Sequence, residues 1–193
     1  MLAVAHFTTG CATAITLCQP KKLTDIIFVG LIGGLAGMWP DCDLGNSKIS
    51  KQANNAMKIL LPLLIFTVLV AHEGINIYDM KRFITFFGGI SVFIAFTVAS
   101  RTRPHREFTH SLVCALGLFI ASKFIIEEYA MAVLVGLLSH IVLDILNTKG
   151  VIVFFPFKKG FKLGLCKSNG IVNKIIPVVC IIYVSISVIV KLM

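Results

Sequence analysis

The sequence predicts an all-α, polytopic membrane protein in which about five to seven helices cross the bilayer or lie half-buried in it. Hydrophobic residues make up 57% of the 193-residue chain and charged residues only 14%, against roughly 25% charged residues in soluble domains. The mean hydropathy is +0.92. A soluble domain of this size needs more polar surface, so we expect one integral membrane domain that spans residues 1–193.

Seven apolar segments divide the chain, and each is expected to form a helix. The segments at 83–100 and 174–192 are long and nearly free of charge. The others fall short of the roughly 20 residues that a full crossing requires, so we expect them to be tilted or half-buried. In chain order the segments are 3–18, 25–39, 57–72, 83–100, 110–126, 130–146 and 174–192.

The second segment is predicted to pack closely against another helix. Gly30 and Gly34, and likewise Gly33 and Gly37, are four residues apart. Small residues at this spacing let two helices approach each other closely in lipid. Pro40 is expected to end this helix, so that a polar loop follows it.

The fifth and sixth segments are predicted to form a tight antiparallel hairpin. Only Glu127, Glu128 and Tyr129 separate them. Thr109 is expected to be the N-cap of the fifth helix, which would place His110 in the first helical turn.

If successive segments alternate in direction, four groups of polar residues reach the same membrane face. The first segment starts at this face, and the second, fourth and sixth segments end at it. The groups are His6, the pair Asp41 and Asp43, the stretch from Arg101 to His110, and the pair His140 and Asp144.

The net charge is +9, and the distribution of the basic residues between the two membrane faces predicts the orientation in the membrane. The basic residues lie between apolar runs, so we expect contact with lipid headgroups and no direct nucleic-acid partner. The face with the polar groups has the larger share of the Lys and Arg residues. The positive-inside rule therefore places that face in the cytoplasm. That face holds Lys48, Lys51, Lys58, Arg101, Arg103, Arg106, Lys149, Lys158, Lys159, Lys162, Lys167 and Lys174, and the other holds Lys21, Lys22, Lys81, Arg82 and Lys191.

His140 and Asp144 are the strongest candidates for chemistry. They are four residues apart in a predicted helix, so both side chains lie on one helix face, one turn apart. Two ionisable groups in an apolar helix are costly unless they are paired or bind a ligand. This favours a metal ion, with a structural His–Asp hydrogen bond between helices as the alternative.

Two further motifs contain suitable ligands. Asp41 and Asp43, in WPDCDLG, supply the hard carboxylate oxygens that divalent cations accept, although such a pair also commonly marks a turn. RPHREFTHS places His105 and His110 beside Arg106, whose planar guanidinium suits an anionic group. The alternative for this second motif is a basic loop at the membrane surface.

The candidate metal ligands outnumber the four that a structural zinc ion takes. They would accommodate two divalent ions with an open position for water, and would leave positive charge to hold an anion. Asp41, Asp43 or Asp144 could act as the general base rather than as a metal ligand. Arg106 would bind the anionic group held at the site. Mixed His and Asp ligation suits zinc, manganese or iron, with zinc as the default. The candidate ligands are His6, Asp41, Asp43, His105, His110, His140 and Asp144.

An early histidine followed by PDCD, HREFTHS and SHIVLDILNTKG resembles the pattern of the YdjM-like family of bacterial inner-membrane proteins. The resemblance covers nearly the whole chain, and its motifs are weak singly but specific together. It implies a multi-pass protein of the bacterial inner membrane, metal-dependent hydrolase activity and a link to the LexA-controlled damage response. The matching positions are His6, Asp41, Asp43, His105, Arg106, His110, His140 and Asp144, with Thr148 and Gly150 closing the last motif.

The leading functional hypothesis is a membrane-embedded hydrolase in which a metal-activated water attacks a phosphate or other ester, with a lipid as one candidate substrate. A divalent-cation transporter is an alternative, but it requires ligands near the bilayer midplane, whereas most candidates here lie at helix ends. The third hypothesis is a regulatory membrane scaffold with a protein partner in the damage response, in which the metal only holds helices together.

Overall fold

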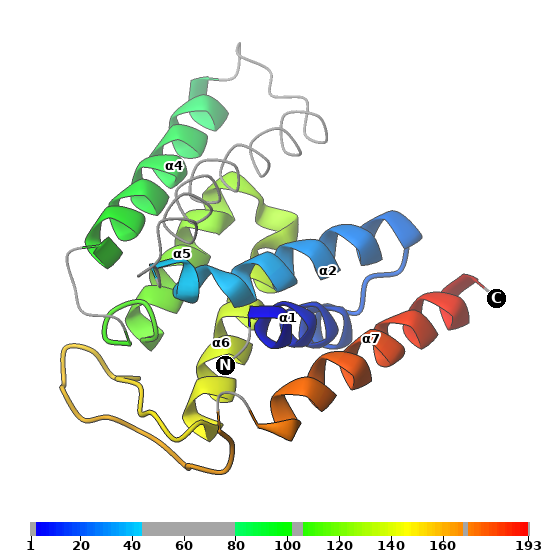
Figure 1. Ribbon diagram of the computed structural model, residues 1–193. Helices are drawn as coiled ribbons and strands as arrows, with labels where there is room; N and C mark the ends of the chain where they lie inside the picture. The colour runs from blue at the N-terminus through cyan, green and yellow to red at the C-terminus, as the bar shows by residue number, and fades with distance from the viewer. Residues whose placement is uncertain (1–2, 44–79, 102–105, 168–169, 193) are drawn as a thin grey trace, which may run out of the picture.

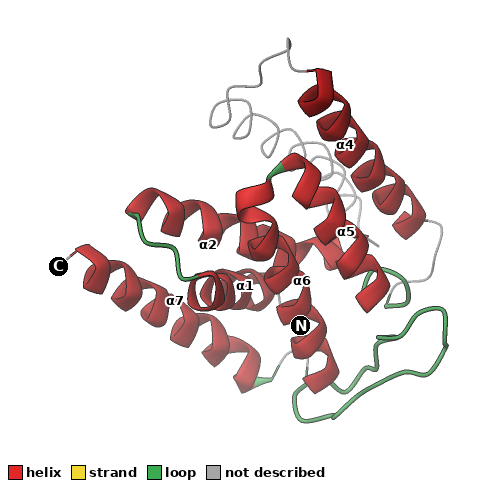
Figure 2. Ribbon diagram, turned by 180° about the vertical axis from the view of Figure 1, so that it is seen from behind, coloured by secondary structure: helices red, strands yellow, loops and turns green. Residues whose placement is uncertain are grey.

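The protein is all-helical throughout the part of the chain that the computed structural model describes, residues 3–43, 80–101, 106–167 and 170–192 (Figures 1 and 2). Six α-helices and two short 3₁₀ helices form within these ranges, and no β-strand does. The elements are α1 (Ala3–Cys18), α2 (Leu23–Met38), η1 (Trp39–Asp43), α4 (Met80–Arg101), α5 (Leu112–Ile125), η2 (Glu127–Tyr129), α6 (Ala130–Leu146) and α7 (Ile171–Leu192).

The predicted fold class is confirmed. Six of the predicted segments correspond to α-helices whose ends differ from the prediction by at most three residues, and the segment predicted at 57–72 lies outside the described residues. Three spans within the described part are long and apolar enough to cross a membrane: Leu23–Asp41, Glu127–Leu146 and Ile171–Val190. Shorter apolar helices run over Ala3–Cys18, Ile84–Ala99 and Leu112–Ile125.

Helices α1, α2 and α6 contact one another and form the centre of the structure (Figure 1). α7 packs against α1, where the hydroxyls of Thr16 and Tyr183 lie 2.8 Å apart in a hydrogen bond. α5 packs beside α6, as the predicted hairpin requires, and α4 covers α5. Large apolar side chains are exposed along α7, including Ile175, Val179 and Ile182. Such a surface is stable where lipid rather than water surrounds it.

Glycines set the distance between the three central helices. A Cβ atom on Gly33 of α2 would collide with α1, and one on Gly136 of α6 would collide with the carbonyl oxygen of Gly33. A Cβ on Gly37 would lie only 2.7 Å from the carbonyl oxygen of His6. The predicted close approach of the glycine face of α2 is therefore present, and it involves both α1 and α6.

A long loop over residues 147–166 runs from the end of α6 to the start of α5 and back to the end of α6 (Figure 2). Val151 and Phe161 pair within the loop through two backbone hydrogen bonds of 3.0 and 2.8 Å. The Val153 carbonyl accepts a hydrogen bond from the Leu112 N–H at 2.9 Å, which ties the loop to the start of α5. This loop and the ends of α1, α2, α5 and α6 surround the functional site.

Candidate metal centre

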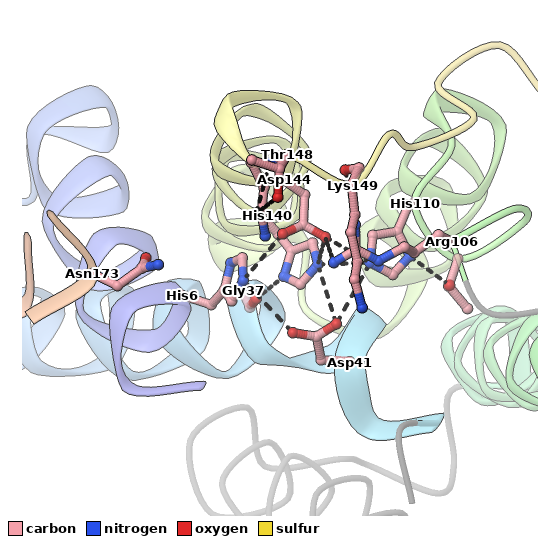
Figure 3. A network of polar contacts seen from close by, with 12 residues as sticks. His6, Gly37, Asp41, Arg106, His110, His140, Asp144, Thr148, Lys149 and Asn173 are labelled. Atoms are coloured by element: carbon pink, nitrogen blue, oxygen red, sulfur yellow. Dashed lines mark hydrogen bonds and ion pairs between the residues drawn. The ribbon is translucent and has the colours of Figure 1, made fainter. Parts of the chain in front are cut away.

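Five ionisable side chains from four separate parts of the chain meet at one end of the central helices (Figure 3). His6 belongs to α1, Asp41 to η1 and His140 and Asp144 to α6, while His110 directly precedes the N-cap of α5. The side chain of Asp41 is 12% exposed, and the other four are fully buried. Burying such groups in apolar surroundings is costly unless they are paired or bind a cation.

Helical geometry accounts for three of these positions. His140 and Asp144 lie one turn apart on the same face of α6. The sequence had suggested that Asp41 lies on an open loop, but Asp41 belongs to the short helix η1. The chain continues from α2 directly into η1, and the N–H of Trp39 bonds to the carbonyls of Leu35 and Ala36. This continuous backbone carries the Asp41 carboxylate to the end of α6.

The predicted N-cap of α5 is wrong. Ser111, not Thr109, caps the helix, because the Ser111 hydroxyl accepts a hydrogen bond from the backbone N–H of Cys114. The Thr109 hydroxyl is instead engaged by Nδ1 of His110, at 2.9 Å. His110 consequently precedes the helix rather than lying in its first turn.

A backbone carbonyl fixes the protonation of His140. Its Nδ1 lies 2.7 Å from the carbonyl oxygen of Gly37. A carbonyl oxygen only accepts hydrogen bonds, so Nδ1 must carry the proton. In the neutral ring Nε2 then presents a lone pair toward the cluster, which is the arrangement usual for metal-binding histidines.

The Thr109 hydroxyl orients the His110 ring, although a hydroxyl can donate or accept and so does not fix which ring nitrogen carries the proton. With its Nδ1 held by the Thr109 hydroxyl, Nε2 of His110 faces Nε2 of His140 at 3.0 Å. The imidazole nitrogens therefore converge on the same point as the carboxylates of Asp41 and Asp144 (Figure 3). The two carboxylates and the imidazole lone pair of His140 repel one another unless a positive charge, from a metal ion or from a proton on His110, lies between them.

The imidazole-to-carboxylate distances of this cluster are longer than hydrogen bonds, whereas Nε2 of His110 and Nε2 of His140, 3.0 Å apart, are within hydrogen-bond distance. Nε2 of His110 lies 3.5 Å from Oδ1 of Asp41 and 3.3 Å from Oδ2 of Asp144. For Nε2 of His140 the distances to the same oxygens are 3.7 and 3.8 Å. Hydrogen bonds of this kind are about 2.7–3.2 Å long, whereas ligands of a tetrahedral ion with bonds near 2.0–2.1 Å lie about 3.3–3.4 Å apart.

The electrostatics of His110 also favour a cation at this point. Burial lowers the pKa of His110, but the carboxylates of Asp144 and Asp41 outweigh burial and raise the pKa above its ordinary value. A positive charge on or beside this ring is therefore stabilised. A metal ion that occupies the site must displace that proton, so its affinity is expected to fall as the pH falls.

Arg106 borders the cluster from the 147–166 loop side. Its Nη1 donates a hydrogen bond of 2.8 Å to the carbonyl of Lys149, and its Nη2 lies 3.6 Å from Oδ2 of Asp144. The backbone of Arg106 has φ 72°, a left-handed conformation that costs a non-glycine residue on the order of 1–3 kcal/mol. A bond of 3.0 Å from the Ile152 N–H to the Arg106 carbonyl helps to hold it.

The remaining predicted site residues differ in what can be said of them. His6 points its Nε2 at the same two carboxylates, 3.6 Å from Oδ2 of Asp41 and 3.6 Å from Oδ1 of Asp144. His105 lies outside the described residues. Asp43 ends η1, and its side chain lies outside what the structure describes.

The groups that orient the histidines were not predicted from the sequence. These are the Gly37 carbonyl and the Thr109 hydroxyl, together with the Lys149 carbonyl that anchors Arg106. Thr109 could have been recognised as the neighbour of a candidate ligand. The two carbonyls carry no signal in the sequence, because every residue has one.

Replacing Thr109 with Val should weaken metal binding by about 10- to 100-fold, the usual effect of losing a residue that supports a metal ligand. Valine keeps the shape but leaves Nδ1 of His110 without its partner at 2.9 Å. Titration of the metal-free protein with Zn²⁺ measures the change. Thr13→Ala is the control, since the Thr13 hydroxyl bonds to the backbone of its own helix. Equal affinity of the Thr109 variant and the wild type would contradict this orienting role.

Comparison with known proteins agrees with the resemblance seen in the motifs. A family model described as YdjM inner membrane protein matches residues 1–192. No curated protein and no solved structure gives a significant match. The family match covers nearly all of the chain, including each element that contributes to the cluster, and the apolar helices agree with a place in the membrane. The chain therefore belongs to the YdjM family of inner membrane proteins.

Proposed function

We propose that this protein is a membrane-embedded, metal-dependent hydrolase that cleaves a phosphate ester or another ester. The observation that carries the proposal is the convergence of four donor atoms, from His110, His140, Asp41 and Asp144, all within 4.8 Å of one another. Hydrogen bonds from outside the cluster hold both imidazoles in the orientation that ligation requires.

In this proposal the four residues hold a divalent ion, and zinc is the metal to test first. A divalent metal at this cluster would supply a Lewis acid that polarises the ester and lowers the pKa of a bound water toward neutrality. The burial of His140 and Asp144 keeps bulk water from competing with the ligands. Arg106 has five N–H donors, and its contacts with Lys149 and Asp144 leave some of them for an anionic oxygen of the substrate.

The surroundings of the site support an amphiphilic substrate. The 147–166 loop, which anchors Arg106 through Lys149, exposes Phe157 and Leu165 beside Lys158 and Lys159. Aromatic and aliphatic side chains interspersed with lysines suit the headgroup region of a bilayer. A lipid with a phosphate ester is therefore the substrate class that we propose first.

We further propose that the site faces the cytoplasm, on the basis of the excess of Lys and Arg on that side of the predicted topology. Cysteine labelling in intact cells and in inverted membrane vesicles tests this orientation. A cysteine introduced into the 147–166 loop should be labelled in the inverted vesicles and protected from labelling in the intact cells. Labelling in intact cells would place the site on the other side of the membrane.

Removal of the metal should abolish hydrolysis. The test uses the full-length protein in lipid nanodiscs with a panel of phosphomonoesters, phosphodiesters and phospholipids. A chelator should reduce product formation to the level of empty nanodiscs, and Zn²⁺ or Mn²⁺ should restore it. A metal-loaded protein that hydrolyses no member of the panel would argue against the proposal and favour a structural role for the metal. Metal uptake by proteoliposomes would instead favour a transporter.

A further inference from the structure

We infer that the site holds two divalent ions rather than one, with Asp41 and Asp144 bridging them and His6 binding the second ion. This inference rests on the proposed metal-dependent function and extends it by assigning a second metal position. His6 is not one of the four residues whose donor atoms all lie within 4.8 Å of one another. Its role therefore needs a separate explanation.

The two oxygens of each carboxylate face different histidines. His110 and His140 approach Oδ1 of Asp41 and Oδ2 of Asp144. His6 approaches the other oxygen of each carboxylate, namely Oδ2 of Asp41 and Oδ1 of Asp144. Each carboxylate thus has one oxygen toward the His110–His140 pair and one toward His6. This is the arrangement in which two carboxylates bridge two ions, which lie about 3.5–4 Å apart in known two-metal sites.

The distances at His6 again separate ligation from hydrogen bonding. Both oxygens lie 3.6 Å from its Nε2, which is beyond the roughly 2.7–3.2 Å of a hydrogen bond. Two ligands of one tetrahedral ion with bonds near 2.0–2.1 Å lie about 3.3–3.4 Å apart, which is closer to the observed 3.6 Å than a hydrogen bond is. Both of these oxygens therefore lie at a distance from Nε2 of His6 that suits ligation of a shared ion better than direct hydrogen bonding.

Hydrogen bonding does not account for the burial of His6. Its side chain is fully buried in an apolar helix, and neither Nδ1 nor Nε2 has a hydrogen-bond partner among the described residues. Its ring stacks on that of His140, with the centroids 3.9 Å apart and the planes at 24°. A buried polar ring without hydrogen bonds is costly, and a metal ion at Nε2 would remove much of that cost.

The two positions differ in how completely the described side chains surround them. The first position has four protein ligands, as in closed structural sites, whereas the second has three. Three protein ligands and an open position are typical of catalytic zinc sites. We therefore assign the water-binding position, and contact with the substrate, to the ion beside His6.

Metal titration with Mn²⁺ as the probe tests this assignment. The full-length protein in nanodiscs is freed of metal, loaded with Mn²⁺, desalted and analysed for metal content and by electron paramagnetic resonance. The wild type should retain two ions per chain with an exchange-coupled spectrum. His6→Ala should retain one ion per chain, with the spectrum of an isolated Mn²⁺. Thr13→Ala, in the same helix, is the control and should behave like the wild type.

The outcomes separate this inference from the proposed function. A wild type that saturates at one uncoupled ion would overturn the second position and leave the metal-dependent hydrolase intact. Two coupled ions in His6→Ala would also overturn it, whereas a wild type without any bound ion would overturn the proposed function itself. His6→Gln is tested alongside in case the alanine variant does not fold, and the wild-type spectrum alone decides whether the ions are coupled.

Discussion

Replacing Asp144 with Asn is expected to remove both the bound metal and the hydrolytic activity. Asn keeps the size of the side chain but not its charge, and Asp144 faces His6, His110, His140 and Arg106 at 3.3–3.8 Å. The loss in metal affinity should well exceed the roughly 10- to 100-fold seen when only a supporting residue is removed. Metal analysis and the ester panel measure the two effects.

Asp25→Asn is the matched control for this experiment. Asp25 lies in the first turn of α2, whereas Asp41 follows the other end of that helix. The control removes the same charge from the protein without touching the cluster, so metal content should be unchanged. Retention of metal and activity in Asp144→Asn would show that the carboxylate is not a ligand.

Replacing Gly136 with Ala should destabilise the protein and disturb the site together. The added Cβ would collide with the Gly33 carbonyl, which is backbone and cannot move aside cheaply. Such overpacking typically costs about 1–3 kcal/mol, occasionally more. His140 lies one turn beyond Gly136 on the same face of α6, so separating α6 from α2 would also lengthen its hydrogen bond to Gly37.

Gly88→Ala provides a control with the opposite sign. Gly88 lies within α4, and a Cβ there would meet nothing within 4 Å. Alanine in a helix interior is favoured over glycine by roughly 0.5–1 kcal/mol, so this variant should be slightly more stable than the wild type. Thermal unfolding of the purified proteins measures both changes. Equal stability of Gly136→Ala and Gly88→Ala would contradict the close helix crossing.

Local patterns made much of the architecture predictable. Apolar runs located the six described helices to within three residues at each end, because in a bilayer each helix satisfies its own backbone hydrogen bonds and is defined by its apolar length. Helical periodicity likewise predicted that His140 and Asp144 share a helix face. Alternation of the segments also suggested that Asp41 and His110 come to the same end of the structure.

Local patterns were less reliable where two residues compete for one role. Thr109 and Ser111 are both good N-caps by residue type, and the sequence favoured the wrong one. The choice depends on His110, whose Nδ1 engages the Thr109 hydroxyl, so that the Ser111 hydroxyl is the one that accepts from the N–H of Cys114. Similarly, the sequence predicted that Arg106 binds an anionic group. It could not show that Arg106 also faces Asp144.

The sequence by itself determined that this is a helical membrane protein of the YdjM family, and it predicted the meeting of the five residues His6, Asp41, His110, His140 and Asp144 at one end of it. Only the tertiary structure decided which oxygen of Asp41 and Asp144 faces which histidine, and that the Gly37 carbonyl sets the tautomer of His140. The physical reason is the distance along the chain over which each feature is determined. Helix length and facing follow from neighbours a few residues apart, whereas donor-atom geometry depends on how closely α1, α2 and α6 pack across their glycines.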